Sequence, residues 1–177
     1  MIRIFVLFLV LITFGCKNEE DESIGINPDN INLSVETAKD VSLIYSDSAV
    51  IKIKVTGPTM LTYKDRVTPK KEFPDGLKVE FFNRGRVGSR LTAKFAVQFD
   101  NKKETILRDS VVWVSSRGEK LETEELIWNE KKKKVSTNRF VKITTTTDVV
   151  YGYGFEAEQD FTKWKILAPQ GDLRIKN

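Results

Sequence analysis

Histidine and cysteine, which serve most often in proton transfer at neutral pH and in zinc binding, are nearly absent from this 177-residue chain. The sequence contains no histidine and a single cysteine, Cys16. A Ser-His-Asp triad, a cysteine–histidine dyad, a histidine-based zinc site and an intramolecular disulfide are therefore excluded. The carboxylates show no spacing that sets a pair apart for acid–base work, and no loop has the alternating oxygen ligands of a calcium site. We expect no catalytic residue, no metal and no cofactor.

Two further motifs indicate structure rather than ligand binding. Gly152-Tyr153-Gly154-Phe155 contains GxG, but it lacks a third glycine and a following helix, so we interpret its glycines as places where a sheet bends or packs closely. The four consecutive lysines at 131–134 could contact phosphates, yet in a hairpin turn such a run is more typical of a solvated loop. The formal charge of +4 does not indicate a nucleic-acid partner.

The cysteine lies at the end of an apolar segment. Residues 4–14 are apolar apart from one threonine, and Gly15 precedes Cys16. A helix of this length covers about 16 Å, roughly half the hydrocarbon core of a bilayer. With one preceding cation, the arrangement has the parts of a signal peptide and resembles a bacterial lipoprotein signal. We predict a cleaved signal peptide over 1–15, a lipid on Cys16 and an acidic tether over 16–32; the alternative is an incidental cysteine in an ordinary signal peptide.

The remaining residues, 33–177, read as one domain of strands. β-branched residues are abundant, apolar and polar residues alternate with a period of two, and no segment sustains a helical period. Roughly a dozen strands joined by short loops predict an all-β, antiparallel domain. Such a sheet must fold over to cover its apolar face, as a sandwich, a jelly roll or an open, taco-like roll.

The alternation also predicts strand ends and faces. We expect Gly57-Pro58 to end the strand that contains Ile51, Ile53 and Val55. Tyr151, Tyr153 and Phe155 are expected on one face of a later strand. A row of inward-facing apolar residues would either form an ordinary core or line a groove for an apolar ligand. The members of this row are Val79, Phe81, Phe95, Val97, Phe99, Val141, Ile143 and Phe155.

Two motifs follow one another between residues 118 and 166. The first runs from Gly118 to Asn129 and reads G-x-x-L-x-T-E-x-L-x-W-N. The second is the G-x-G-F segment at 152–155, with Asp160 five residues after its phenylalanine. Together they resemble the LptC family, the periplasmic component of the lipopolysaccharide transport bridge, and the related OstA-type proteins of the same bridge.

This resemblance implies a twisted β-jelly roll whose two sheets form an open V, with the acyl chains of lipid A between them. The inward apolar row would then be the lipid contacts. Family members receive lipopolysaccharide from an inner-membrane ABC transporter and pass it to an OstA-like bridge protein by stacking edge strands. By its place in the chain, the segment Gly171, Asp172, Leu173 and Arg174 resembles the edge where the next protein docks.

The N-terminus departs from the family, whose well-known members carry a transmembrane helix there. A lipid on Cys16 would instead hold this protein at the periplasmic face of the inner membrane, with the outer membrane as the alternative. A different function also stays open: a surface or periplasmic β-sandwich lipoprotein that binds glycan or protein. An enzyme would have to work with carboxylates, Ser, Lys or Tyr alone, and is the least supported possibility.

Overall fold

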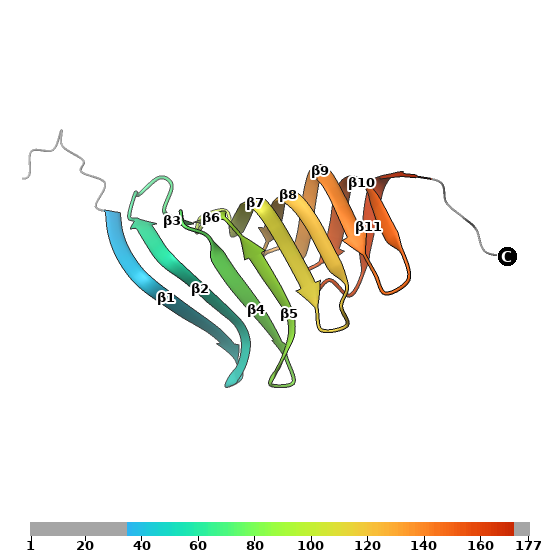
Figure 1. Ribbon diagram of the computed structural model, residues 1–177. Helices are drawn as coiled ribbons and strands as arrows, with labels where there is room; N and C mark the ends of the chain where they lie inside the picture. The colour runs from blue at the N-terminus through green and yellow to red at the C-terminus, as the bar shows by residue number, and fades with distance from the viewer. Residues whose placement is uncertain (1–34, 172–177) are drawn as a thin grey trace, which may run out of the picture. The chain divides into compact units, whose positions relative to one another are not determined.

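The computed structural model describes residues 35–171, and within them it contains eleven antiparallel strands and no helix (Figure 1). No helix of the length and apolarity that a membrane crossing requires is therefore found in this part of the chain. The predicted all-β fold is confirmed. The strands are β1 (Val35–Asp47), β2 (Val50–Tyr63), β3 (Lys70–Phe73), β4 (Leu77–Asn83), β5 (Arg86–Ala93), β6 (Phe95–Phe99), β7 (Glu104–Ser115), β8 (Lys120–Asn129), β9 (Lys134–Thr144), β10 (Val149–Glu158) and β11 (Trp164–Gln170).

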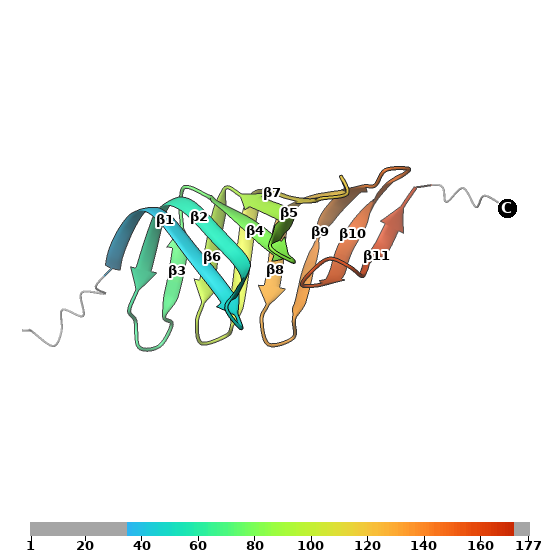
Figure 2. The same ribbon diagram turned by 90° about the horizontal axis from the view of Figure 1, so that it is seen from below.

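The long strands take part in two walls of one sheet. β2 pairs with β4 over its first half and with β3 over its second half. β7 pairs with β6 over its first half and with β5 over its last residues. β3 and β4, like β5 and β6, are thus two halves of one bent strand, and the remaining strands follow as a meander to β11 (Figure 2). The fold agrees with the antiparallel jelly roll that the family resemblance implies, with one folded sheet in place of two separate sheets.

The two walls can be defined by their residues. Wall A comprises 41–57, 77–93, 111–123, 141–153 and 168–170. Wall B comprises 35–39, 59–73, 95–108, 125–137 and 155–166. The pairing registers connect each set of segments side by side, so every long strand contributes one half to each wall.

A line of backbone irregularities marks the corner between the walls. Asp40, Asp109 and Gly154 have φ values of 49°, 62° and 73°, in β1, β7 and β10 respectively. The register of β7 with β8 shifts between Arg108 and Val111, and that of β10 with β9 shifts between Tyr153 and Phe155. A left-handed residue or a bulge bends its strand and increases the local twist, so such irregularities in line across the strands fold the whole sheet along one axis.

The prediction that Gly57-Pro58 ends a strand is wrong. β2 continues through both residues to Tyr63. Pro58 lies where β2 changes its partner from β4 to β3, and Asp40, which stands opposite it on β1, is skipped in the pairing. Proline has no backbone N–H, and it is tolerated at this position because residue 58 has no cross-strand partner to which an N–H would donate.

At two glycines of the corner, neighbouring backbones approach so closely that a side chain would be crowded. A Cβ on Gly57 would lie 3.0 Å from the carbonyl oxygen of Gly76, and one on Gly76 would lie 2.7 Å from that of Ala93. Next along the corner, the Lys94 N–H donates to the Asp109 carbonyl oxygen over 3.0 Å. Strands β2 to β7 are therefore in backbone contact where the sheet folds.

The prediction that Phe155 shares a face with Tyr151 and Tyr153 is also wrong. Gly154 has a left-handed backbone and interrupts the alternation of β10, and the register of β10 with β9 shifts by one residue at this place. Phe155 is consequently 1% exposed, whereas Tyr151 and Tyr153 remain 40% and 51% exposed. Both tyrosines contact Phe140 on the outer face of the sheet.

We predict that Gly76→Ala destabilises the fold by about 2–3 kcal/mol, because Gly76 combines a φ of +85° with a close backbone oxygen. Urea unfolding followed by circular dichroism measures the change. Gly88→Ala is the matched control, since its Cβ would meet only ordinary contacts at 3.4 Å or more. Equal stability of the two variants would contradict the role given to the corner.

Candidate lipid-contacting surface between the walls

The inner face of wall A carries a continuous row of apolar side chains. Each member is the direct cross-strand partner of the next, so the row runs across seven strands from β1 to β9. The members are Leu43, Val55, Val79, Leu91, Trp113, Leu121 and Ile143. Wall B faces it with the row Phe73, Ala96, Leu107 and Leu126. All eleven residues belong to the hydrophobic core or pack against it.

One end of this inner surface is open and the other is closed. The open half consists of Leu43, Val55, Met60, Val79 and Phe81, which are half-buried and lie on β1, β2 and β4. Farther along the same row, Leu91, Trp113, Leu121 and Ile143 are between 1% and 6% exposed. Most of the partly accessible apolar side chains that pack against the core thus lie toward the N-terminal strands, and the other two are Trp128 and Ile166.

The closed half consists of Trp113, Leu121, Ile143, Phe155 and Phe161. Phe161 comes from the loop between β10 and β11 and is 5% exposed. Its ring stacks on that of Trp113, with centroids 4.4 Å apart and planes at 18°, and it lies 6.3 Å from the ring of Phe155. Only about 10 Å³ of cavity is left among these side chains. An acyl chain does not fit there in this conformation.

The structure brings five of the eight predicted groove residues together. Val79 and Phe81 lie in the open half, and Val141, Ile143 and Phe155 lie in the buried core. The other three, Phe95, Val97 and Phe99, alternate along β6 with Ala96, which is the core member of that strand. Neighbouring strand residues point to opposite faces, so these three face outward. Val97 is only 6% exposed, yet it is not part of the core cluster.

Sequence reasoning missed Leu43, Leu91, Trp113, Leu121 and Phe161. Four of these five occupy strands whose alternation is interrupted by a bulge or diluted by serine and threonine. Phe161 lies in a loop, where alternation gives no information. A signal was nevertheless present for Leu121, because it is the leucine of the first family-like motif.

Some predicted residues lie outside the described part of the chain. Of the expected partner edge, only Gly171 is described, directly after β11. Asp172, Leu173 and Arg174 are not described, and neither is Cys16. Within residues 35–171, β1 and β11 are the two edge strands of the sheet.

The loops of wall B form a basic margin, which we define as residues 64–69, 100–103, 130–133 and 159–163. Backbone hydrogen bonds of 2.9–3.1 Å join neighbouring loops of the margin, from Asp100 to Pro69, from Glu130 to Lys103 and from Gln159 to Lys133. The margin carries eight lysines and arginines against four carboxylates. The opposite loops, of wall A, carry two of each. Positive charge is therefore concentrated in the loops of wall B, three of which project side by side in Figure 2.

Lysines next to the margin are held in the charged form. A hydrogen bond to Glu72 raises the pKa of Lys70, whose Nζ lies 2.6 Å from the carboxylate. A hydrogen bond to Glu158 likewise raises the pKa of Lys134. Both side chains therefore stay cationic at any physiological pH.

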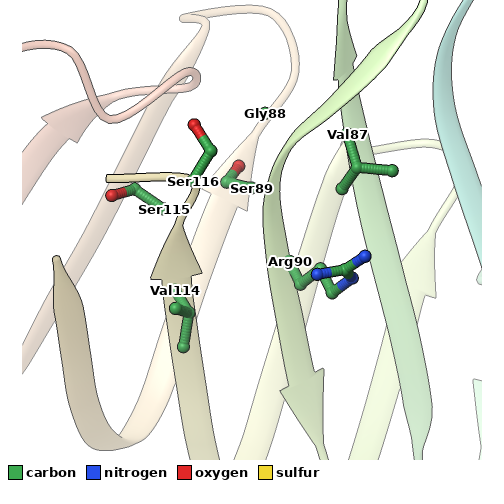
Figure 3. A pocket seen from close by; sticks show the side chains of 7 residues that line it. All are labelled: Val87, Gly88, Ser89, Arg90, Val114, Ser115 and Ser116. Atoms are coloured by element: carbon green, nitrogen blue, oxygen red, sulfur yellow. The ribbon is translucent and has the colours of Figure 1, made fainter. Parts of the chain in front are cut away.

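A second hollow, of about 290 Å³, lies at the ends of β5 and β7 and is lined by Val87, Gly88, Ser89, Arg90, Val114, Ser115 and Ser116 (Figure 3). Two of its polar side chains, Arg90 and Ser115, are already engaged. Arg90 Nε lies 3.0 Å from Glu80, which lowers the pKa of that carboxyl, and Ser115 Oγ donates to Glu119 over 3.0 Å. Among the described residues, no three potential metal ligands gather at one place. The apolar space between the walls is thus the stronger candidate site.

Comparison with known proteins adds one finding. The family model described as "Lipopolysaccharide-assembly, LptC-related" matches the chain over residues 4–168. A search of curated proteins finds no match to the chain.

We predict different effects of a buried charge in the two halves. Phe81→Asp in the open half should lower the free energy of unfolding by about 1–2 kcal/mol, because the carboxylate can reach water. Leu121→Asp in the closed half should cost more than about 4 kcal/mol, because Leu121 is 1% exposed. Urea unfolding of both variants measures this. Similar losses would show that the two halves are equally closed in solution.

Proposed function

The chain belongs to the LptC family, and we propose that it accepts lipopolysaccharide from an inner-membrane ABC transporter and passes it between its two walls to the next jelly-roll protein. Membership itself implies a role in lipopolysaccharide transport and an association with the transport machinery. The family is periplasmic, is associated with the inner membrane, and is one of transport components rather than enzymes.

The observation that carries the proposal is the open half beside a basic margin. Each methylene of an acyl chain that stays in water costs about 0.8 kcal/mol, so half-buried apolar side chains between two walls are a favourable place for it. Phosphorylated head groups form charge-assisted hydrogen bonds with lysines. An amphiphile with several acyl chains and a phosphorylated head would satisfy both surfaces at once.

Hand-over would use the edges of the sheet. β1 and β11 each have one side without a strand partner in the described part of the chain, and exposed backbone groups on an edge can pair with a strand of another protein. Residues Gly171, Asp172, Leu173 and Arg174 would extend the β11 edge toward an OstA-like bridge protein. The apolar row runs across the strands, so stacked jelly rolls would join their inner surfaces. No catalytic residue is required, because the transporter hydrolyses ATP.

We predict that a photo-crosslinker placed at Phe81 in cells labels lipopolysaccharide, whereas one placed at Ile44 does not. Phe81 lies in the open half, and Ile44 is 57% exposed next to Leu43 in β1, on the outer face of the sheet. Mass spectrometry of the adduct identifies the lipid.

The same assay tests the basic margin. Replacing Lys131, Lys132 and Lys133 by Glu should lower the adduct yield at Phe81 on the order of a hundredfold, since each of the three lysines contributes about 1 kcal/mol near an anionic surface. The matched control replaces three exposed lysines outside the margin, Lys52, Lys94 and Lys142. A glycan-binding or protein-binding sandwich would give no lipid adduct at Phe81, and that result would overturn the proposal.

The membrane attachment is part of the proposal. A multiply acylated Cys16, after removal of residues 1–15, would hold the domain at the periplasmic face of the inner membrane through the tether 16–32, with the outer membrane as the alternative. Cys16→Ser should release the protein into the soluble periplasmic fraction. Fractionation with immunoblotting measures this, and separation of the inner and outer membranes distinguishes the two destinations. A variant that stays membrane-bound would rule out the lipid anchor.

A further inference from the structure

Phe161 is a loop residue with the burial of a core residue. It lies in the segment of the basic margin that joins β10 to β11, where its neighbours Asp160, Thr162 and Lys163 are exposed. The hairpin loops after β2, β6 and β8 project along one margin, whereas this loop turns back and does not project with them (Figure 2). Its ring reaches from wall B across to Trp113 on wall A.

The backbone at Phe161 is unfavourable for its side chain. The Phe161 N–H donates to the Glu158 carbonyl oxygen over 2.9 Å, which closes a tight turn, and φ at Phe161 is +57°. That left-handed position in a hairpin loop is normally taken by glycine or asparagine, because a Cβ is crowded there. The contacts of the buried ring must offset this strain for the closed conformation to persist.

A second observation points to a ligand at the same place. Trp113, which stacks on Phe161, is 6% exposed, and its indole N–H has no hydrogen-bond acceptor among the described residues. Buried polar groups without a partner are rare in folded proteins. The ester, amide or hydroxyl oxygen of an acylated lipid is an acceptor that would satisfy this N–H.

We infer that the Phe161 ring occupies the place of a lipid acyl chain, and that Phe161 leaves the closed half when lipid enters it. The inference rests on the proposed function and adds how passage through the sheet is controlled. Lipid that moves from the open half toward β11 must pass along Leu91, Trp113 and Leu121, and Phe161 fills the space beside Trp113. In the free protein this side chain keeps the closed half dry and blocks the path.

Withdrawal of the ring does not require the sheet to open. The last described pair of β10 and β11 before the loop is Ala157 with Trp164, so the loop can change shape while the strand pairing persists. One backbone hydrogen bond, from Gln159 to Lys133, joins the loop to its neighbour in the margin. An acyl chain would replace one set of apolar contacts by another, and the strain at Phe161 would be released.

The test uses the purified chain with purified lipopolysaccharide and a photo-crosslinker at Phe81 or at Trp164. Phe81 reports the open half, and Trp164, which is 39% exposed, lines the cavity of the closed half. Phe161→Gly and Phe161→Asn remove the ring and suit the left-handed backbone. Both variants should give adducts at Trp164 at about tenfold lower lipopolysaccharide concentration than the native protein. In the native protein lipid can enter only after the Phe161 ring has left the closed half, and in the variants this step is not needed. The yield at Phe81 should not change.

Phe140→Ala is the matched control, since it removes a phenylalanine ring from the outer face, and it should behave like the native protein. A variant in which Trp113 is the one remaining tryptophan allows a measurement without any change at position 161. Addition of lipopolysaccharide should shift the fluorescence emission of Trp113. Adducts at Phe81 together with unchanged Trp164 labelling in both Phe161 variants, or with unchanged Trp113 emission, would overturn the inference alone. Absence of adducts at Phe81 in every protein would overturn the proposed function, and the inference with it.

Discussion

The common bend of the long strands is the constraint on which the rest of the molecule depends. A strand exposes one face to the core and one to solvent, so a single sheet can bury its apolar face only by folding onto itself. The left-handed residues Asp40, Asp109 and Gly154 place that fold at one line. At Gly57 and Gly76 the backbones approach so closely that a Cβ would crowd a carbonyl oxygen. Two apolar faces then oppose each other without a second sheet.

The inner surface of the folded sheet has two ends, and in this protein side chains fill the closed half but not the open half. In the closed half, Phe161 adds a ring from outside the strands and completes the packing between Trp113 and Phe155. No residue of the described part plays this role in the open half, where Val79 and Phe81 stay half-buried. Accessible apolar surface is costly in water, which is the physical reason to assign it to a lipid ligand rather than to the stability of the fold.

Charge is distributed as unevenly as burial. The net charge of +4 is unremarkable for the whole chain, but the eight cations of the basic margin are gathered by four loops that lie far apart in sequence. Hydrogen bonds between adjacent loops, such as that from Glu130 to Lys103, hold the margin together. An apolar interior beside such a margin has the polarity of a phosphorylated, multiply acylated lipid, which agrees with the role of the LptC family in lipopolysaccharide transport.

The sequence by itself determined that the domain is all-β and antiparallel, because alternation is local, and it determined the family, because the motif from Gly118 to Asn129 is contiguous. Only the tertiary structure decided which face is inside. An alternation with a period of two does not show which face of a strand is buried. The pattern therefore predicts Phe95, Val97 and Phe99 as core residues, although Ala96 is the core residue of that strand. The left-handed backbone of Gly154 reverses the faces of β10, and the burial of a loop residue depends on Trp113, nearly fifty positions away. Such contacts arise from the fold of the sheet and leave no local pattern.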